Sequence, residues 1–128
     1  MAMNTLPAYL KSIEYDENLS LVSLDTSIGT LWVLLLATQD MRQDMSVGAE
    51  LCAIFKPTQV LLTAQNPAPY VQNCFASRIT HIQKDAILSL VSLEGGIDAL
   101  VPTRGIDNLG EGDHCFWYVN PSDVLLES

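Results

Sequence analysis

Two short turns in this chain carry residue types that can hold an anion. Lys56-Pro57-Thr58 and Asn120-Pro121-Ser122 each follow an apolar stretch, and in both a proline precedes a hydroxyl residue. The proline removes one amide donor, and the hydroxyl and its neighbouring N–H groups can then converge on one point. Such a cluster suits a tetrahedral oxyanion, because hydroxyls and amides donate hydrogen bonds without requiring a positively charged protein. The alternative is an ordinary turn whose hydroxyl caps its own backbone.

The two turns belong to an internal repeat. The hexapeptide LSLVSL occurs at residues 19–24 and again at 88–93, an offset of 88 − 19 = 69 that also relates Asn4 to Asn73. The turns are related by 120 − 56 = 64, so the second copy is 69 − 64 = 5 residues shorter. Self-similarity of this kind indicates tandem structural units. We expect a first repeat at residues 1–64, a linker at 65–72 and a second repeat at 73–128.

The apolar spacing of each repeat predicts five short strands. A break in the two-residue period at Ile13 and at Ile82 predicts a bulge in the first strand of each repeat. After the third strand a short segment has helical spacing, with Thr38 and Thr103 as its expected N-caps. The predicted fold class is therefore all-β, with two tandem OB-like five-stranded barrels that each carry one short helical turn. The expected strands lie near 6–13, 18–25, 30–37, 50–56 and 60–62, and near 75–82, 87–94, 97–102, 113–119 and 124–126.

Charge and hydropathy exclude several classes of partner. The net charge is −9, with 15 acidic and 6 scattered basic residues, whereas nucleic-acid binding depends on clustered Lys and Arg. The longest apolar run, residues 31–37, is far shorter than the roughly 20 residues of a membrane span. The N-terminus lacks the pattern of a signal peptide, and the 3 cysteines have no close spacing. We expect a reduced cytoplasmic protein with neither a nucleic-acid nor a membrane partner.

Catalytic chemistry has little support in the sequence. Asp113-His114-Cys115 contains residue types found in thiol nucleophiles and zinc sites. Neighbours on a strand point to opposite faces, so His114 and Cys115 are poorly placed to meet one ligand. No Ser-His-Asp set, paired carboxylates or glycine-rich phosphate loop is present. We therefore expect no enzyme, no catalytic residue, no metal-ion site and no organic cofactor.

The hydrophobic content of 48% is high for units of this size. A sixty-residue unit buries only about 60% of its unfolded surface and is marginally stable alone. We therefore expect further burial between the repeats or between subunits of an oligomer.

The paired motifs resemble the molbindins, tandem Mop domains of the TOBE superfamily that bind molybdate or tungstate inside bacterial cells. NTLPAYLKSI and NCFASRITHI resemble the start of the Mop pattern, and DMSVGAELCAIFKPTQVLL and NLGEGDHCFWYVNPSDVLL resemble its end. The resemblance covers both halves of the chain apart from the linker. Three departures from the pattern involve donors: Met3 and Gln72 replace its usual Arg, and Asn120 replaces its terminal Lys.

The resemblance implies a cytoplasmic oxyanion-binding protein for molybdenum storage or homeostasis, assembled as a homo-oligomer, with a trimer favoured. Its implied ligand is molybdate or tungstate, bound where domains or subunits meet. The alternative is a TOBE-type oligomerisation or regulatory module that has lost anion binding, which the three departures favour. By resemblance the candidate anion contacts are Asn4, Lys56 and Thr58 in the first repeat, Asn73 and Ser122 in the second, and, more weakly, Thr38 and Thr103.

Overall fold

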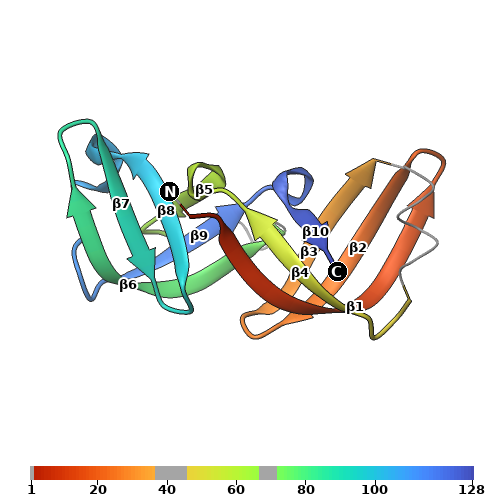
Figure 1. The fold of residues 1–128 in the computed structure, drawn as a ribbon. Coiled ribbons are helices and arrows are strands. Elements are labelled where there is room, and N and C mark those ends of the chain that lie inside the picture. The colour runs from red at the N-terminus through yellow and green to blue at the C-terminus, as the bar shows by residue number, and fades with distance from the viewer. Residues whose placement is uncertain (1, 37–45, 67–71) are drawn as a thin grey trace.

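The structure is a computed structural model that describes residues 2–36, 46–66 and 72–128. It is all-β, and its only helical elements in these ranges are three short 3₁₀ turns (Figure 1). The elements are β1 (Asn4–Asp16), β2 (Leu19–Thr26), β3 (Gly29–Leu36), β4 (Glu50–Phe55), η1 (Pro57–Gln59), β5 (Val60–Thr63), β6 (Cys74–Lys84), β7 (Leu88–Leu93), β8 (Ile97–Pro102), η2 (Thr103–Ile106), β9 (His114–Val119), η3 (Pro121–Asp123) and β10 (Leu125–Glu127).

The first strand of each repeat is long and serves two partners. The N-terminal part of β1, Asn4 to Tyr9, pairs with β4, and its C-terminal part pairs with β2. In β6 the corresponding parts pair with β9 and β7. The register slips between Leu10 and Ser12 in β1, and between Ile79 and His81 in β6, which confirms the two predicted bulges. Such a bulge bends its strand and increases the local twist, so one strand can belong to both sides of a small barrel.

The fifth strands are exchanged between the repeats. The two sheets have the orders β10-β4-β1-β2-β3 and β5-β9-β6-β7-β8. We call them the first unit and the second unit. The first repeat thus contributes β5 to the second unit, where Val60 to Thr63 pair with β9, and the second repeat contributes β10 to the first unit. The barrel strands predicted from the sequence are present, but each barrel is completed by the other repeat.

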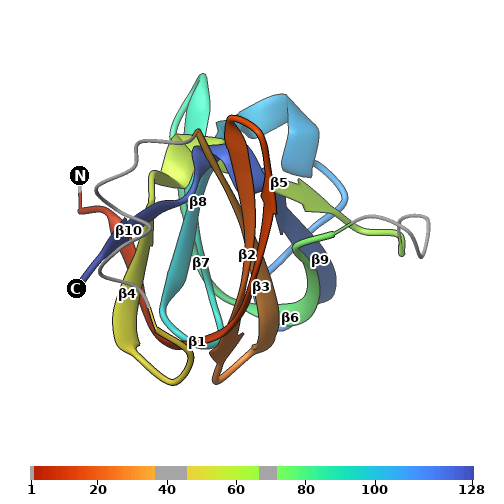
Figure 2. The ribbon, with the colours of Figure 1, turned by 90° about the vertical axis from the view of Figure 1, so that its right-hand side faces the viewer.

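The hydrophobic core is continuous across the two units. Alternate residues of β1, β4, β8 and β9 are buried, as the two-residue period predicts. Phe55 of the first unit stacks on Trp117 of the second, with ring centroids 5.8 Å apart, and Phe75 packs on the same indole at 4.8 Å. Because these rings and the exchanged strands join the two units, separating the units would expose buried aromatic rings as well as unpaired strand edges. Figure 2 shows both termini on one side of the molecule.

Of the two predicted helical segments, the structure describes only the one in the second repeat. Thr38 and the segment at 39–45 lie outside the described residues. In the second repeat the helical turn is the 3₁₀ helix η2, but the prediction that Thr103 caps it is wrong. The N-cap position is Pro102 and no side chain caps the helix. The Thr103 hydroxyl donates instead to the carbonyl of Asp85 (2.7 Å), which fastens η2 to the β6–β7 turn.

Candidate anion site

Asn4 joins the two units through its side-chain amide. Its Nδ2 donates to the carbonyl oxygen of Asp98 in β8 (2.8 Å), and its Oδ1 accepts from the Asp98 N–H (2.8 Å). The side chain thereby pairs with the outer edge of β8 as a neighbouring strand would. Asn4 is 3% exposed, so these bonds are sheltered from water. In Figure 1 the N-terminus accordingly lies beside β8.

Asn73 makes the reciprocal contact. Its Nδ2 donates to the carbonyl oxygen of Trp32 in β3 (2.7 Å), and its Oδ1 accepts from the Trp32 N–H (2.6 Å). Asn73 is also 3% exposed and has a φ of 56°, in the left-handed region that Asn tolerates better than most residues. In each repeat, an Asn at the same repeat position therefore forms hydrogen bonds to the third strand of the other unit.

The strand register brings the candidate residues together in two groups. Asn4 pairs with Phe55, which directly precedes Lys56-Pro57-Thr58, and η1 packs on β8. In the second repeat the Val119 N–H donates to the Asn73 carbonyl (3.2 Å), which places Asn73 at the start of the second turn. We call Asn4, Lys56 and Thr58 the first site, and Asn73, Asn120 and Ser122 the second site. Both lie where a turn from one repeat meets a strand of the opposite unit.

The turn of the first site leaves its donors open. The Lys56 N–H donates to Gln59 Oε1 (2.8 Å), and the Gln59 N–H donates to the Lys56 carbonyl (2.9 Å). Because these bonds close the turn without Thr58, its amide and hydroxyl have no hydrogen-bond partner among the described residues. Thr58 is exposed, so both donors are accessible to a ligand.

The turn of the second site is closed on itself. Asn120 Oδ1 accepts from both the amide (3.0 Å) and the hydroxyl (2.9 Å) of Ser122. This is the ordinary self-capped turn considered as the alternative from the sequence, and it occurs in one copy of the repeat. An anion at Ser122 would have to displace Asn120, whereas at Thr58 it would displace only water.

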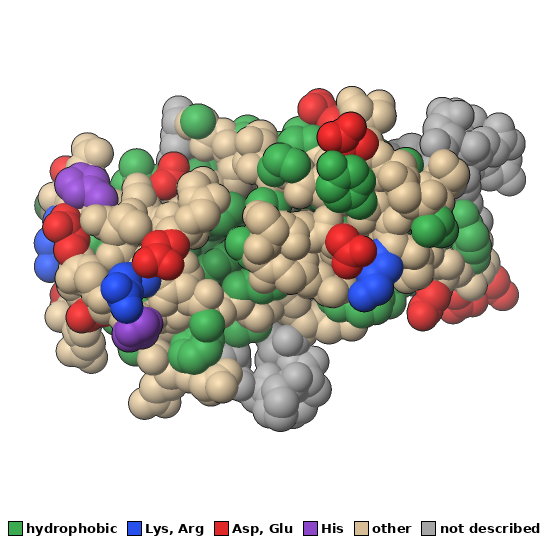
Figure 3. Space-filling model, turned by 90° about the horizontal axis from the view of Figure 1, so that it is seen from below, with side chains coloured by type: hydrophobic (Ala, Val, Ile, Leu, Met, Phe, Trp, Pro, Cys, Tyr) green, Lys and Arg blue, Asp and Glu red, His purple; other side chains and the backbone are tan. Residues whose placement is uncertain are grey.

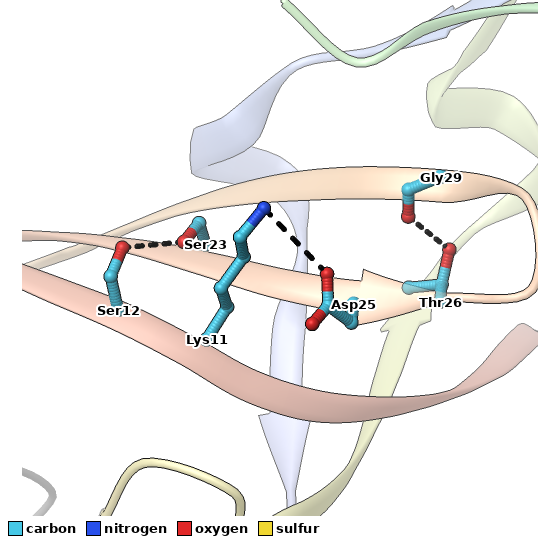
Figure 4. A network of polar contacts seen from close by, with 6 residues as sticks. All are labelled: Lys11, Ser12, Ser23, Asp25, Thr26 and Gly29. Atoms are coloured by element: carbon cyan, nitrogen blue, oxygen red, sulfur yellow. Dashed lines mark hydrogen bonds and ion pairs between the residues drawn. The ribbon is translucent and has the colours of Figure 1, made fainter.

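Lys56 is the charged donor of the first site. Its ammonium forms no salt bridge within the described residues, whereas Lys11 pairs with Asp25 (3.9 Å) and Arg78 with Glu94 (3.9 Å). Figure 4 shows the Lys11–Asp25 pair beside the hydrogen bonds that link Ser12 to Ser23 and Thr26 to Gly29. On the face drawn in Figure 3 the basic side chains likewise lie next to acidic ones. The Lys56 charge is therefore available for a ligand.

Thr103 is not part of either site. Its amide donates to the Ile87 carbonyl (2.8 Å), and its hydroxyl, besides donating to Asp85, lies 2.7 Å from the hydroxyl of Ser89. It therefore fastens the start of η2 to the turn before β7. Thr38 is outside the described residues.

The Asp113-His114-Cys115 run is taken up by structural contacts. Asp113 accepts from the Gly110 N–H (2.8 Å), His114 Nε2 lies 3.2 Å from Arg78 Nη2, and Cys115 is buried. Burial raises the pKa of the Cys115 thiol, which disfavours the reactive thiolate. Within residues 2–36, 46–66 and 72–128, no three His, Cys, Asp or Glu side chains are placed to hold a metal ion.

Sequence reasoning missed Asp98 and Trp32, whose backbones complete the two sites from the opposite unit. The available signal was that Asn4 and Asn73 occupy the same repeat position, at or directly before the start of the first strand of each repeat. A buried Asn at such a position needs hydrogen-bond partners, and here those partners are backbone groups distant in sequence.

No family model and no curated protein sequence matches this chain. Among solved structures, it is similar to a molybdate-bound crystal form of the cytoplasmic molybdate-binding protein ModG. The TM-score is 0.85 at 18% identity, over 96% of this chain and 94% of that chain. No helix in the described ranges is long and apolar enough to cross a membrane. The comparison shows that this chain shares the fold of ModG.

Proposed function

We propose that this protein binds a tetrahedral oxyanion, molybdate or tungstate, and that the first site is its main contact. The observation that carries the proposal is the open turn at Lys56-Pro57-Thr58, which offers an ammonium, a hydroxyl and an amide beside Asn4. Charge-assisted hydrogen bonds contribute about 1.5 to 3 kcal/mol each, so an unpaired Lys56 is the strongest single donor. The likeness to molybdate-bound ModG supports the class of ligand.

The proposed role is reversible binding in the cytoplasm, for storage or homeostasis of molybdenum. The groups that the first site offers to a ligand are hydrogen-bond donors, which suit reversible binding of an anion at equilibrium. ModG, described as a cytoplasmic molybdate-binding protein, supports this setting.

Self-association is part of the proposal, with a trimer as the expected state. Leu125 in β10 and Leu61 in β5 occupy equivalent repeat positions (125 − 61 = 64), and both are 59% exposed. Leu125 also borders an apolar cleft of about 540 Å³ with Met3, Leu35 and Ile54. A second copy would cover this surface and could add donors to a site that one chain leaves open.

A second candidate function has its own support. The side chains of Asn4 and Asn73 are engaged in joining the units, and Ser122 is engaged by Asn120. These contacts favour an oligomerisation or regulatory module in which the second turn, at least, binds no anion.

Titration calorimetry of the intact protein with molybdate, tungstate, sulfate and phosphate tests the proposal. Lys56→Ala should weaken molybdate binding at least tenfold, while Lys84→Ala, a change of equal charge at the end of β6, should have little effect. If none of the four anions binds, the oligomerisation module takes the place of the oxyanion-binding function.

A further inference from the structure

We propose that Asp98, contributed by the second unit, sets how tightly the first site holds a dianion. This inference rests on the proposed function, because it concerns the same site. It assigns an affinity-determining role to a residue whose carboxylate would not itself bind the ligand.

The placement of Asp98 follows from Asn4. Both hydrogen bonds of the Asn4 amide go to the backbone of this one residue, N–H and carbonyl, at 2.8 Å each. The turn that carries Lys56 and Thr58 packs on the same strand, β8. The Asp98 carboxylate is joined to this anchored backbone by a short side chain, on the strand that both Asn4 and η1 contact.

The Asp98 carboxylate faces outward and has no salt-bridge partner among the described residues. Ile97 and Ala99, its neighbours on β8, are 1% and 0% exposed and point into the core, so strand alternation directs Asp98 to the outer face. The residue is half-buried. Within the described part of the chain, no salt bridge or hydrogen bond engages its carboxylate. No cation of the described residues therefore lies within salt-bridge distance of its negative charge, which water screens only in part.

This charge opposes the ligand that the first site would hold. A dianion beside Lys56 would gain from the ammonium and lose from the carboxylate, and both effects follow Coulomb's law. Asp98 therefore lowers the affinity that the open donors of Lys56 and Thr58 would otherwise give. The site would hold its anion loosely enough to release it when the free concentration falls.

The second site has no carboxylate on the opposite strand. Asn73 binds the backbone of Trp32 as Asn4 binds that of Asp98, so the residue at the equivalent place is a neutral indole. The acidic residue of the second site is Asp123, which lies in the turn itself, directly after Ser122. The first site thus combines open donors with a carboxylate on the opposite strand, and the second combines closed donors with a carboxylate on its own turn.

Asp98→Asn is a sharp test because the hydrogen bonds to Asn4 involve only the backbone of residue 98. The substitution removes the charge and keeps the size of the side chain. We expect molybdate and tungstate to bind about tenfold more tightly, equivalent to about 1.4 kcal/mol. Glu94→Gln is the matched control: it removes one negative charge from the second unit, at a side chain paired with Arg78. The molybdate affinity of Glu94→Gln should stay within a factor of two of that of the unsubstituted protein, because exposed ion pairs contribute little energy.

Calorimetry of the three proteins separates the outcomes. Tighter binding by Asp98→Asn alone supports the inference. If binding appears only in this variant, the opposing effect of Asp98 is confirmed but the proposed function of the unsubstituted protein fails. If the unsubstituted protein binds molybdate and Asp98→Asn binds equally or more weakly, the inference is overturned while the proposed function stands. Equal tightening by Glu94→Gln also overturns it, because net charge would then account for the effect. If neither the unsubstituted protein nor Asp98→Asn binds any anion, both proposals fail together.

Discussion

The two Asn contacts allow a prediction in which the sign of an effect reverses between equivalent positions. Asn4 and Asn73 each make two hydrogen bonds to one backbone residue of the opposite unit, at 2.6–2.8 Å, and each is 3% exposed. They differ in backbone conformation. Asn73 has a φ of 56°, whereas Asn4 lies in a regular pairing with Phe55 and has no positive φ.

The magnitudes follow from these contacts. Removing either side chain loses two hydrogen bonds of about 1 kcal/mol each, so Asn4→Ala should destabilise the protein by about 2 kcal/mol. Asn73→Ala also places a Cβ-bearing residue without a compensating side chain in the left-handed region, which costs about 1 to 2 kcal/mol more. Glycine removes that strain at residue 73 but adds conformational freedom to the unfolded chain at residue 4. We therefore expect Gly to be more stable than Ala at position 73, and Ala to be more stable than Gly at position 4.

Urea unfolding at one fixed protein concentration, followed by circular dichroism, measures these differences as shifts of the midpoint at a constant slope. A fixed concentration matters because self-association would add to the apparent stability. If Asn73→Ala costs less than about 1 kcal/mol, the cross-unit bonds contribute little and the assignment of Asn73 as a structural link is wrong. If Ala and Gly rank in the same order at both positions, the left-handed backbone at residue 73 does not contribute as argued.

Three further predictions concern the ligand and the assembly. Lys56→Ala should weaken molybdate binding far more than Asn120→Ala, because Asn120 carries no charge and its side chain already accepts hydrogen bonds from Ser122. Equal losses of affinity in calorimetry would contradict this asymmetry. Molybdate at millimolar concentration should raise the melting temperature more than phosphate, since a pocket of donors leaves the phosphate proton without an acceptor at a cost of about 1 to 3 kcal/mol; equal stabilisation would refute the donor-only pocket. Light scattering across a dilution series should give the mass of a trimer, and a monomer at micromolar concentration would remove the proposed subunit contact.

The strands were predictable because burial on one face fixes a two-residue period. In β1 the period places Leu6, Ala8 and Leu10 in the core, and its interruption before Ile13 marks the bulge. The repeated hexapeptide gives β2 and β7 the same pattern of burial: Val22 and Leu24 are buried in β2, and Val91 and Leu93 are buried in β7. Local patterns of this kind depend only on neighbouring residues, and the structure confirms them in both copies.

The exchange of the fifth strands was not predictable from such patterns. Val60 and Val124 are buried in the exchanged arrangement, and the similarity of the two repeats means that each strand's own barrel would offer it a similar groove. A choice between the strand's own barrel and its neighbour depends on the path of the turn before it. Pro57 and Pro121 restrict that path, but which barrel each strand reaches is a property of the whole chain.

The same limit applies to the candidate residues. Asn4 and Asn73 were selected as anion contacts by resemblance, which stays a prediction; the role that the structure shows they share is the contact between the units. The structure gives them partners that are backbone groups 94 and 41 residues away in sequence, which no spacing rule reveals. Asp98 was missed for the same reason, since its backbone meets the first site through a contact with Asn4, 94 residues away in sequence.

Under the proposed function, the cross-unit contacts offer a way for two equivalent turns to differ in binding. Each site is built from one repeat's turn and the other unit's strand, so a single substitution on the strand changes a site without altering the turn that supplies its donors. The first turn pairs Lys56 with a strand carrying Asp98, and the second pairs Asn120 with a strand carrying Trp32. In the first site, the donors and the opposing carboxylate are therefore encoded in different repeats. Because the exchanged strands hold both units in one core, the repeats can diverge in ligand affinity while the contact that joins them stays the same.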